Sequence, residues 1–345
     1  MRQVQSVLFQ RPRVVVVETV EIPKPGRSEV SVRVVYSAVS AGTELLAYRG
    51  EMPNDLPADE VLKDFSEPFK YPCSFGYCTA GEVDAIGDGV PRDWLGKKVF
   101  AFKAHASSYI CDPSELIPIP EDIELKDAVM FPSVETAVTL VMDAHPRLGD
   151  SVAVIGQGVV GLLTAKIISA YYPMSKLVTA DMHPMRQERS LSYTGAALAD
   201  GSHAEAKKRL RKAATNSEFS GADITIEVSG TGSGFETAVD VTGDNGKIVL
   251  GSWFGSKAVL LNNLGGRFHR SHITIVASQV SSVPAQLSGR WSKGRRFEVA
   301  WNAVRQLKPS CLITWTAKLS EAPYVYEVLD TSPSQQLQIV FYHKK

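Results

Sequence analysis

The chain has 345 residues, of which 44% are hydrophobic and 21% charged, and its 37 basic and 37 acidic side chains cancel to a formal net charge of zero. This length allows two domains with separate cores, and the charge balance argues against nucleic acid as the main partner, because a polyphosphate binder needs a basic surplus. No apolar run approaches the roughly 20 residues of a membrane span, and the N-terminus lacks the apolar core of a signal peptide, so we expect a cytoplasmic protein with no membrane partner.

The first third of the chain is predicted to form β-structure. Val14–Val17 is a β-branched run, and valines recur at every second position over Val30–Val34 after a Pro-Gly turn. Further short strands are expected over Ala80–Ile86, Lys98–Phe102 and Ser108–Cys111. These segments predict a compact barrel of antiparallel strands.

From about residue 123 the pattern changes to strands alternating with helix-length segments, which is typical of a parallel sheet with crossover helices. The strands are mostly continuous apolar runs, as burial on both faces requires; they are Ser151–Ile155, Lys176–Ala180, Ile224–Val228, Lys247–Leu250 and Ile273–Ala277. Helices are expected to begin near Gly158, Pro184, Ala204 and Gly234. A helix over Phe297–Leu307 and a strand over Gln336–Phe341 are expected to return to the first domain.

A glycine fingerprint follows the first expected parallel strand directly. The residues with the G-x-G-x-x-G spacing are Gly156, Gln157, Gly158, Val159, Val160 and Gly161. Gly156 would permit the tight turn, Gly158 would let a pyrophosphate approach the backbone, and Gly161 would let the helix pack against the strand. The phosphates would lie at the positive helix N-terminus. These features predict a dinucleotide site.

Asp181 lies 20 residues after Gly161, at the end of the next strand, where a carboxylate would accept hydrogen bonds from the adenosine ribose hydroxyls. This favours NAD over NADP, because a 2′-phosphate would meet like charge, although Arg186 and Arg189 could soften the repulsion. The alternative is that Asp181 only caps the helix that begins at Pro184.

Other charged and sulfur-bearing groups are interpreted as structural. The cysteines contain no Cys-x-x-Cys pair and are too few for a disulfide framework, so reduced thiols are expected at Cys73, Cys78, Cys111 and Cys311. The basic cluster over Lys207–Lys212 is interpreted as a solvated helix face rather than a binding patch. Likewise, Arg267–His272 is interpreted as an exposed connection or subunit contact rather than an anion clamp.

The order of a small β domain, a mid-chain fingerprint and a short C-terminal return resembles the medium-chain dehydrogenase/reductase superfamily of alcohol dehydrogenase-like proteins. Supporting segments are Ser40–Glu44, Gly76–Val83, Gly96–Val99 and Gly221–Glu227. The resemblance covers nearly the whole chain and is strongest to the branch of bacteriochlorophyllide hydroxyethyl dehydrogenases. It implies an α/β protein with a GroES-like antiparallel barrel over residues 1–122, completed by 288–345, and a Rossmann domain over 123–287.

The resemblance also implies a lost metal. Zinc-using members bind the catalytic metal through a Cys-Gly-Thr-Asp-like motif, a Gly-His-Glu motif and a later acid or cysteine, where this chain has Ala41, Tyr77 and Phe131. Zinc prefers thiolate, imidazole or carboxylate ligands, so we expect no zinc. The cysteines of the family's structural zinc lobe are absent too, since no cysteine lies between Cys78 and Cys111. A metal site improvised from Glu44, Cys78 and Glu135 is the less favoured alternative.

Hydride transfer to a carbonyl still needs a proton donor or an oxyanion partner. By resemblance, Thr43 matches a proton-relaying hydroxyl and Tyr77 replaces a ligand histidine, so both are predicted to be catalytic. Alternatively, Tyr77 and Phe131 only fill the vacated metal cavity. The predicted substrate pocket comprises Tyr48, Phe131 and Glu135, with Lys103 and His105 as weaker candidates. Glu135 is equally suited to capping or to pairing with a base, and for His105 a surface or structural role is favoured.

On the cofactor side, the resemblance predicts that the residues after two successive strands flank the nicotinamide and its ribose, and that the residues after a third bind the carboxamide. These are Ser229, Gly230, Gly251, Ser252 and Trp253, then Ser278 and Gln279. We therefore expect a zinc-independent, NAD(P)(H)-dependent oxidoreductase acting on a hydroxyl/carbonyl pair of a small organic substrate. Reduction of a polarised C=C bond, and a catalytically silent cofactor-binding scaffold or sensor, are the alternatives. The family's usual pairing through the edge strand, here about Ile273–Ala277, implies a homodimer.

Overall fold

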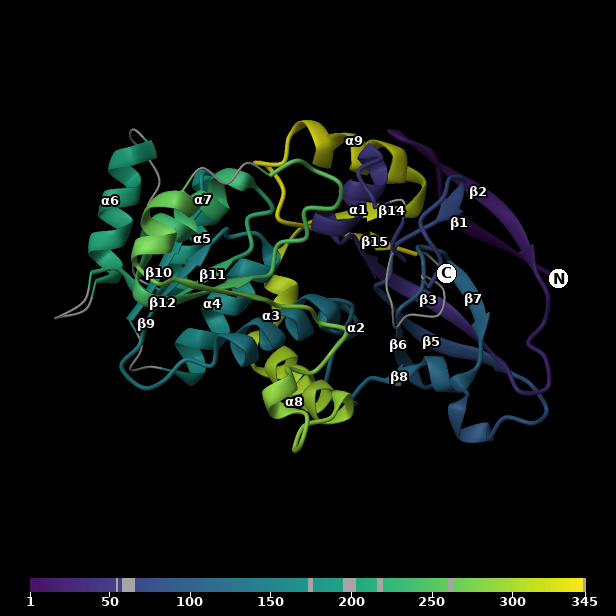
Figure 1. Cartoon of the computed structure of the whole chain (residues 1–345). Coiled ribbons are helices and arrows are strands. Elements are labelled where there is room, and N and C mark those ends of the chain that lie inside the picture. The colour runs from purple at the N-terminus through teal and green to yellow at the C-terminus, as the bar shows by residue number, and fades with distance from the viewer. Residues whose placement is uncertain are drawn as a thin grey trace. The chain divides into compact units, whose positions relative to one another are not determined.

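The computed structural model describes residues 1–53, 55–57, 66–172, 176–194, 203–215, 220–259 and 263–343. The chain divides into two compact units (Figure 1). The first, called the β unit below, comprises Met1–Pro132 and Val304–Lys345, and the second, the α/β unit, comprises Ser133–Ala303. The expected division lay at residues 122 and 288. The beginning of helix α8 (Lys293–Leu307) groups with the α/β unit because the buried Arg296 side chain binds residues of that unit.

The β unit contains two sheets. The smaller has the strand order β2-β1-β4, and the larger has the order β14-β15-β3-β5-β6-β8 with β7 also paired to β3. All pairs are antiparallel except β14 with β15. The strands are β1 (Arg2–Arg11), β2 (Val14–Ile22), β3 (Val30–Ala38), β4 (Cys73–Ser74), β5 (Thr79–Ile86), β6 (Lys98–Ala101), β7 (Ser108–Cys111), β8 (Ile117–Pro118), β14 (Ile313–Lys318) and β15 (Gln338–Tyr342).

The β unit also contains helices, some of which contribute to an aromatic-rich core. They are α1 (Ala41–Arg49), α2 (Leu125–Ala128) and α9 (Ala322–Thr331), with 3₁₀ turns at Arg92–Trp94, Pro113–Glu115, Pro309–Leu312 and Leu319–Glu321. Phe9, Tyr48, Tyr326 and Phe341 are buried together in this core. The sequence predicts β2, β3, β5, β6, β7 and β15 but not β1, β4, β8, β14, α1, α2 or α9, so much of what closes this core comes from unpredicted elements.

The α/β unit contains a five-stranded parallel sheet in the order β10-β9-β11-β12-β13. Its strands are β9 (Ser151–Ile155), β10 (Lys176–Ala180), β11 (Ala222–Glu227), β12 (Thr242–Leu250) and β13 (Thr274–Ala277). Strand β9 is fully buried, as expected for a central parallel strand. The predicted α/β class, with one parallel and one largely antiparallel region, is therefore confirmed.

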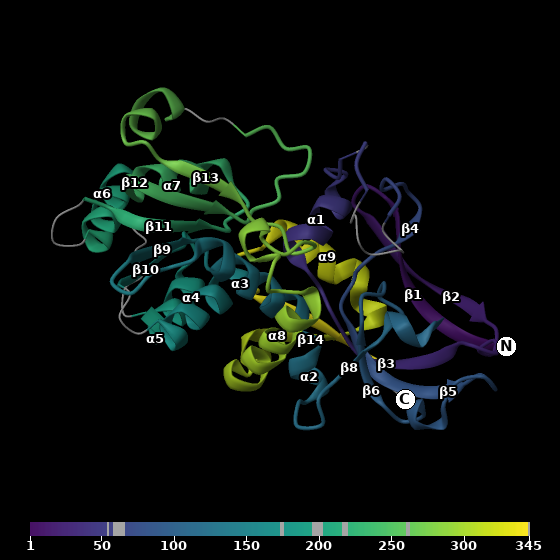
Figure 2. The same cartoon turned by 60° about the horizontal axis from the view of Figure 1, so that its bottom comes forward.

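Crossover helices cover both faces of the parallel sheet. They are α4 (Val159–Tyr171), α5 (Pro184–Thr194), α6 (His203–Ala214) and α7 (Gly232–Val241); α3 (Phe131–Ala144) precedes the sheet, and short turns lie at Leu264–Phe268 and Ala285–Leu287. Helix α4 packs with α5, and α6 packs with α7. In Figure 2 the first pair lies below the strands. Among the described residues, no helix is long and apolar enough to span a bilayer.

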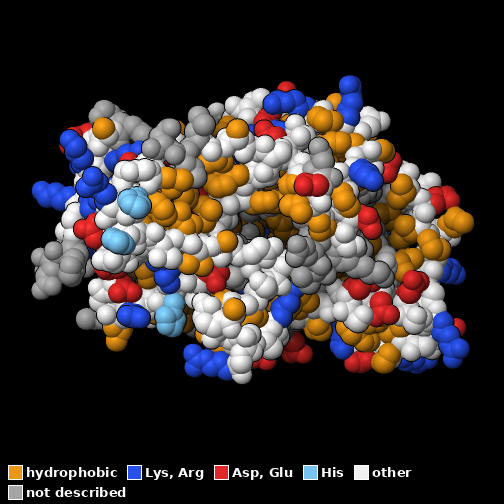
Figure 3. Space-filling view, in the orientation of Figure 1, with side chains coloured by type: hydrophobic (Ala, Val, Ile, Leu, Met, Phe, Trp, Pro, Cys, Tyr) orange, Lys and Arg blue, Asp and Glu red, His pale blue; other side chains and the backbone are white. Residues whose placement is uncertain are grey.

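The basic cluster lies on α6. Lys208, Arg209 and Lys212 are exposed, and Figure 3 shows Lys and Arg side chains at the end of the molecule where α6 lies. The remaining two basic residues are tethered: Lys207 pairs with Asp240 at 2.8 Å, and Arg211 donates to nearby backbone carbonyls. The solvated-face interpretation thus holds for three of the five residues. No disulfide joins the four cysteines, all of which lie among the described residues, and their reduced state stays a prediction.

Candidate active site

The fingerprint turn links β9 to α4 in the α/β unit. Gly156 adopts a φ of 97°, and a Cβ there would lie 2.7 Å from the Cα of Ser229. A Cβ on Gly161 would lie 2.9 Å from the carbonyl carbon of Gly156 and 3.3 Å from Val228. Both positions therefore require glycine, for the turn and for helix packing respectively.

The middle glycine of the fingerprint has a different environment. Gly158 is the N-cap of α4 and has extended backbone, and a Cβ on it would meet no atom of a described residue within 4 Å. This open space adjoins the N-terminus of a 13-residue helix, where backbone N–H groups favour an anion. Val159 and Val160 form the first turn of the helix and are half-buried. The backbone around Gly158 thus fits a dinucleotide phosphate.

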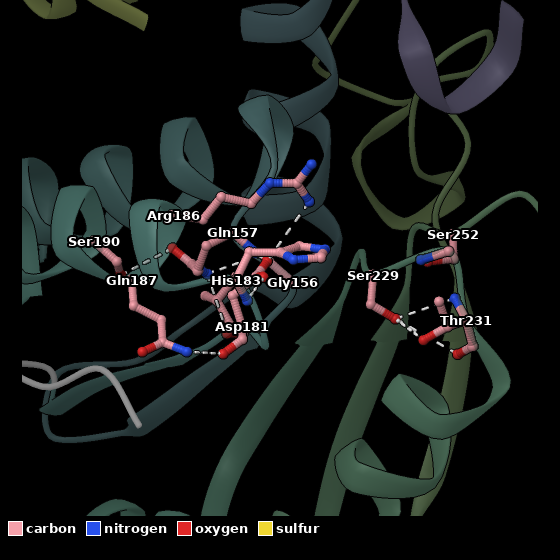
Figure 4. Close-up of polar contacts among 12 residues, drawn as sticks. Gly156, Gln157, Asp181, His183, Arg186, Gln187, Ser190, Ser229, Thr231 and Ser252 are labelled. Atoms are coloured by element: carbon pink, nitrogen blue, oxygen red, sulfur yellow. Dashed lines mark hydrogen bonds and ion pairs between the residues drawn. The ribbon is translucent and has the colours of Figure 1, made fainter. Parts of the chain in front are cut away.

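Gln157 and Asp181 brace this turn (Figure 4). The side chain of Gln157 is buried, where its amide donates to the carbonyl of Gly156 and its oxygen accepts from Ser190. Its backbone N–H donates to Asp181 Oδ2 at 2.7 Å. Asp181 Oδ1 also accepts from the N–H of His183 at 2.8 Å, just before α5, and Arg186 Nη1 lies 3.9 Å from Oδ2. Asp181 therefore caps the backbone just before α5 and also connects the end of β10 to the fingerprint.

The ends of β11 and β12 meet beside the fingerprint. Ser252 Oγ accepts from the N–H of Gly230 at 2.8 Å, and Ser229 contacts the hydroxyl of Thr231 at 3.0 Å (Figure 4). Gly251 is closely packed, since a Cβ there would lie 3.0 Å from Val228. Trp253, by contrast, is 40% exposed, so its indole is available to a ligand.

The predicted carboxamide ligands already have partners. Ser278 donates a 2.6 Å hydrogen bond to Asp143, and burial raises the pKa of that carboxyl above its ordinary value. Gln279 is hydrogen-bonded to Ser281, which lies two residues later. Both side chains are thus committed to local structure, and their carboxamide role remains a prediction. The stretch Arg267–His272 includes exposed His269 and Arg270, in agreement with an exposed connection before β13.

In the β unit, a hydroxyl cluster surrounds the N-terminus of α1. The phenol of Tyr77 donates to Ser40 Oγ and lies 3.2 Å from Thr43 Oγ1. Burial raises the pKa of Tyr77 well above its ordinary value, and the hydroxyls of Ser40 and Thr43 only partly oppose this. Tyr77 is therefore a neutral phenol at physiological pH, suited to donating a hydrogen bond rather than removing a proton. Ser40 was not predicted to be part of the site, although it immediately precedes the recognised Ala41–Thr43 motif.

A second, fully buried cluster supports the first. Glu44 Oε1 accepts from the N–H of Ser40 at 2.7 Å, while Oε2 accepts from Tyr326 at 2.5 Å and lies 3.0 Å from His105 Nε2. Glu44, His105 and Tyr326 are all completely inaccessible to solvent. His105 is thus a hydrogen-bonded structural residue, which was the favoured interpretation, and the less favoured Lys103 pairs with Glu115 at 2.7 Å.

The three residues predicted to line the substrate pocket are packed inside their units. Tyr48 is buried and stacks on Tyr326 with ring centroids 5.9 Å apart. Phe131 is completely buried against Phe100. Glu135 is 2% exposed and accepts a 2.7 Å hydrogen bond from the equally buried Arg296. In the structure the first two are thus aromatic core residues and the third forms a buried ion pair, and their role in a substrate pocket stays a prediction.

The donor set expected for zinc in this family does not fit zinc. Alanine has no donor atom, a neutral phenol is a poor zinc ligand, and Phe131 is buried in apolar contact. Burial also raises the pKa of the Cys78 thiol well above its ordinary value, which disfavours the thiolate that a metal requires. Among the described residues, no three His, Cys, Asp or Glu side chains are grouped as metal ligands.

Comparisons with known proteins agree with this geometry, although no family model matches the chain. D-guloside 3-dehydrogenase of Escherichia coli K12 is 24% identical over 331 residues, covering 90% of this chain and 92% of the relative. A solved E. coli CFT073 structure, described as a short chain alcohol dehydrogenase complexed with NADH, has a TM-score of 0.76 at 18% identity and covers 99% and 100% of the two chains. A candidate zinc-binding dehydrogenase of Sinorhizobium meliloti 1021 bound to NADP has a TM-score of 0.74 at 14% identity, with coverage of 99% and 100%. The predicted resemblance to alcohol dehydrogenase-like proteins is thus confirmed, whereas the branch and the loss of zinc stay predictions.

Proposed function

Because the chain resembles alcohol dehydrogenase-like medium-chain dehydrogenases and reductases over nearly its whole length, we propose that it is an NAD(P)(H)-dependent oxidoreductase that interconverts a hydroxyl and a carbonyl without zinc. The observation that carries this proposal is the fingerprint turn, in which glycine is required at Gly156 and Gly161 while the space at Gly158 is open. The β unit contributes the hydroxyl cluster that handles the proton.

Cofactor binding rests on the carboxyl ends of three parallel strands. The N–H groups at the start of α4 would hold the pyrophosphate, and Asp181 would accept hydrogen bonds from the adenosine ribose. When bound, the nicotinamide supplies or accepts a hydride. The position of Asp181 supports a preference for NAD over NADP, because a 2′-phosphate would lie near its charge, while Arg186 at 3.9 Å from the carboxylate moderates that repulsion.

The proposed zinc independence rests on the chemistry of the replacing residues. The positions that supply metal ligands in zinc-using members hold Ala41, Tyr77 and Phe131. Tyr77 then replaces the metal's role at the substrate oxygen. Its raised pKa keeps the phenolic proton in place, so that it can be turned from Ser40 toward a carbonyl oxygen on which negative charge develops. This favours carbonyl reduction, with Thr43 as the second hydroxyl of the relay.

Sugar and polyol carbonyls are the substrates to test first. The E. coli relative is named for oxidation at position 3 of a D-guloside, and a Bacillus subtilis relative is named as an (R,R)-butanediol dehydrogenase. We further propose a cytoplasmic homodimer that pairs through β13, which is the edge strand of its sheet.

The test is a fluorescence titration of the purified protein with NADH and NADPH, with metal content measured on the same sample. We expect NADH binding, substoichiometric zinc, and carbonyl reduction that withstands a chelator. Activity that disappears on chelation and returns with zinc would refute the zinc-free proposal. Failure to bind either cofactor would refute the oxidoreductase and leave a scaffold. A saturated carbonyl product from an unsaturated one would instead identify a C=C reductase.

A further inference from the structure

A buried carboxyl that the proposed reaction does not use lies at the centre of the α/β unit. Glu227 is the last residue of β11, the middle strand of the sheet, and its side chain is inaccessible to solvent. Its Oε1 accepts two hydrogen bonds from Ser229, one from the N–H at 2.8 Å and one from the hydroxyl at 2.5 Å. Its Oε2 is enclosed and makes no hydrogen bond with a described residue.

Such an arrangement lowers the stability of the fold unless the carboxyl makes a compensating interaction. A buried polar atom without a partner loses its hydration, and a buried carboxyl loses more when it is ionised. Burial accordingly raises the pKa of Glu227, and its hydrogen bonds from Ser229 oppose this. A leucine would fill the same space without this cost. The two bonds to Ser229 are therefore the gain that distinguishes a carboxyl at this position.

Those two bonds fix the turn that follows β11, Val228–Thr231. On one side the turn packs against the fingerprint, since a Cβ on Gly156 would lie 2.7 Å from both the N and the Cα of Ser229. On the other side, the N–H of Gly230 donates to Ser252 at the end of β12. Helix α7 packs against the carboxyl, because a Cβ on Gly234 would lie 3.1 Å from Glu227 Oε1. The turns after β9 and β12 thus both contact the turn after β11, which Glu227 holds through Ser229.

We propose that Glu227 is a positioning residue for the nicotinamide half of the dinucleotide. Its carboxyl holds the turn Val228–Thr231 at a fixed place between Gly156 and Ser252, and this turn forms the surface that receives the nicotinamide ribose. The inference rests on the proposed function, because it assumes that a dinucleotide binds at these strand ends. Because Oε1 is the acceptor in both bonds, an amide oxygen can replace it, whereas an aliphatic side chain cannot.

The experiment compares three variants by fluorescence titration with NADH and by competition with ADP, which lacks the nicotinamide and its ribose. For Glu227→Ala, which loses both acceptor bonds, we expect the NADH dissociation constant to rise by about tenfold or more while that for ADP changes by less than about twofold. For Glu227→Gln we expect NADH binding within about threefold of the unchanged protein. Glu236→Gln on α7 makes the same charge change away from the turn and should match the unchanged protein.

Each contrary result has a separate meaning. Unchanged NADH affinity in Glu227→Ala, or equal losses for NADH and ADP, would overturn the positioning role, as would a Gln variant as defective as the Ala variant. If Glu227→Ala does not fold, Ser229→Ala removes one donor to the same carboxyl. It should weaken NADH binding by about threefold without affecting ADP, and no change would again overturn the proposal. If the unchanged protein binds neither NADH nor NADPH, the proposed function itself fails.

Discussion

The phenol of Tyr326 donates a 2.5 Å hydrogen bond to the carboxylate of Glu44, 282 positions earlier in the chain. Through this bond α9 holds the same carboxylate that accepts from the N–H of Ser40 at the start of α1. The catalytic hydroxyls that we propose, Tyr77 and Thr43, are thus supported by a residue near the C-terminus. We expect Tyr326→Phe to lower the free energy of unfolding by about 1–3 kcal/mol, since a buried acceptor loses a donor. Urea denaturation measures this, and Tyr324→Phe on the exposed side of α9 is the control.

Tyr77→Phe tests the proton-handling role. Because the phenol is the proposed donor to the substrate oxygen, we expect turnover to fall by about 10²- to 10⁴-fold, with unchanged NADH affinity. Steady-state kinetics on a carbonyl substrate found by screening gives the first value, and fluorescence titration the second. Tyr109→Phe removes another buried phenol of the β unit, which contacts Thr79 at 3.3 Å, and should retain turnover. Full activity in Tyr77→Phe would mean that this ring only fills space.

Asp181→Asn tests the cofactor preference. The amide oxygen can still accept from the N–H of Gln157, but the charge that repels a 2′-phosphate is gone. We expect the ratio of NADPH to NADH dissociation constants to fall by about tenfold, which corresponds to about 1.4 kcal/mol. Asp150→Asn, at the turn before β9, is the matched control for the loss of one charge. A ratio that does not move would leave Asp181 as a helix cap alone.

The buried His343 is expected to make the free energy of unfolding fall at acid pH. Burial lowers the pKa of His343 from 6.5 to about 3, and the neighbouring His105 is the smaller cause of the same shift. The unfolded chain therefore takes up a proton below pH 6.5 that the folded chain refuses, so the stabilisation is complete above that pH and declines as the pH falls toward 3. His343 contributes up to about 1.4 kcal/mol per pH unit to the slope of the unfolding free energy against pH.

Unfolding free energies measured from pH 7 to pH 4 check this expectation. His343→Gln should flatten the decline, whereas His145→Asn, at an exposed histidine, should leave it unchanged. Parallel curves for the unchanged protein and His343→Gln would contradict the assignment.

The buried pair of Glu135 and Arg296 predicts a large effect on folding. Glu135→Ala leaves a guanidinium with no solvent access without its carboxylate, and we expect a loss of about 3–5 kcal/mol in unfolding free energy. Asp122→Ala removes the exposed partner of Arg305 and should change stability far less. Similar losses in the two variants would show that burial does not set the value of the first pair.

The elements that the sequence predicts best are those whose signal is local. Ser151–Ile155 and Lys176–Ala180 form strands with the predicted bounds. For the first, continuous burial on both faces demands an apolar run. The fingerprint was recognisable because its glycines fall within six adjacent residues, although the atoms that exclude a Cβ at Gly156 belong to the distant Ser229 and Val228. Local patterns therefore sufficed for the cofactor side of the site.

What the sequence could not indicate depends on contacts between distant segments. Tyr48 and Phe131 were expected in a pocket by resemblance, because relatives have substrate-lining or metal-binding residues at these positions, but a large aromatic side chain equally favours a core. The pairing of Glu135 with Arg296 spans 161 positions, and no spacing rule could predict it. In the sequence Glu227 is recognisable only as part of an expected strand, because its neighbours do not indicate that one of its oxygens lacks a partner.

The discontinuous β unit has a consequence for biosynthesis. In its larger sheet β15 lies between β14 and β3, so the strand that follows residue 337 completes a sheet begun before residue 40. The α/β unit, by contrast, is one unbroken stretch and can fold on the ribosome while the β unit still has an unpaired strand edge. Until translation reaches β15, that edge is open to aberrant pairing, and chaperone dependence should be concentrated in this late interval.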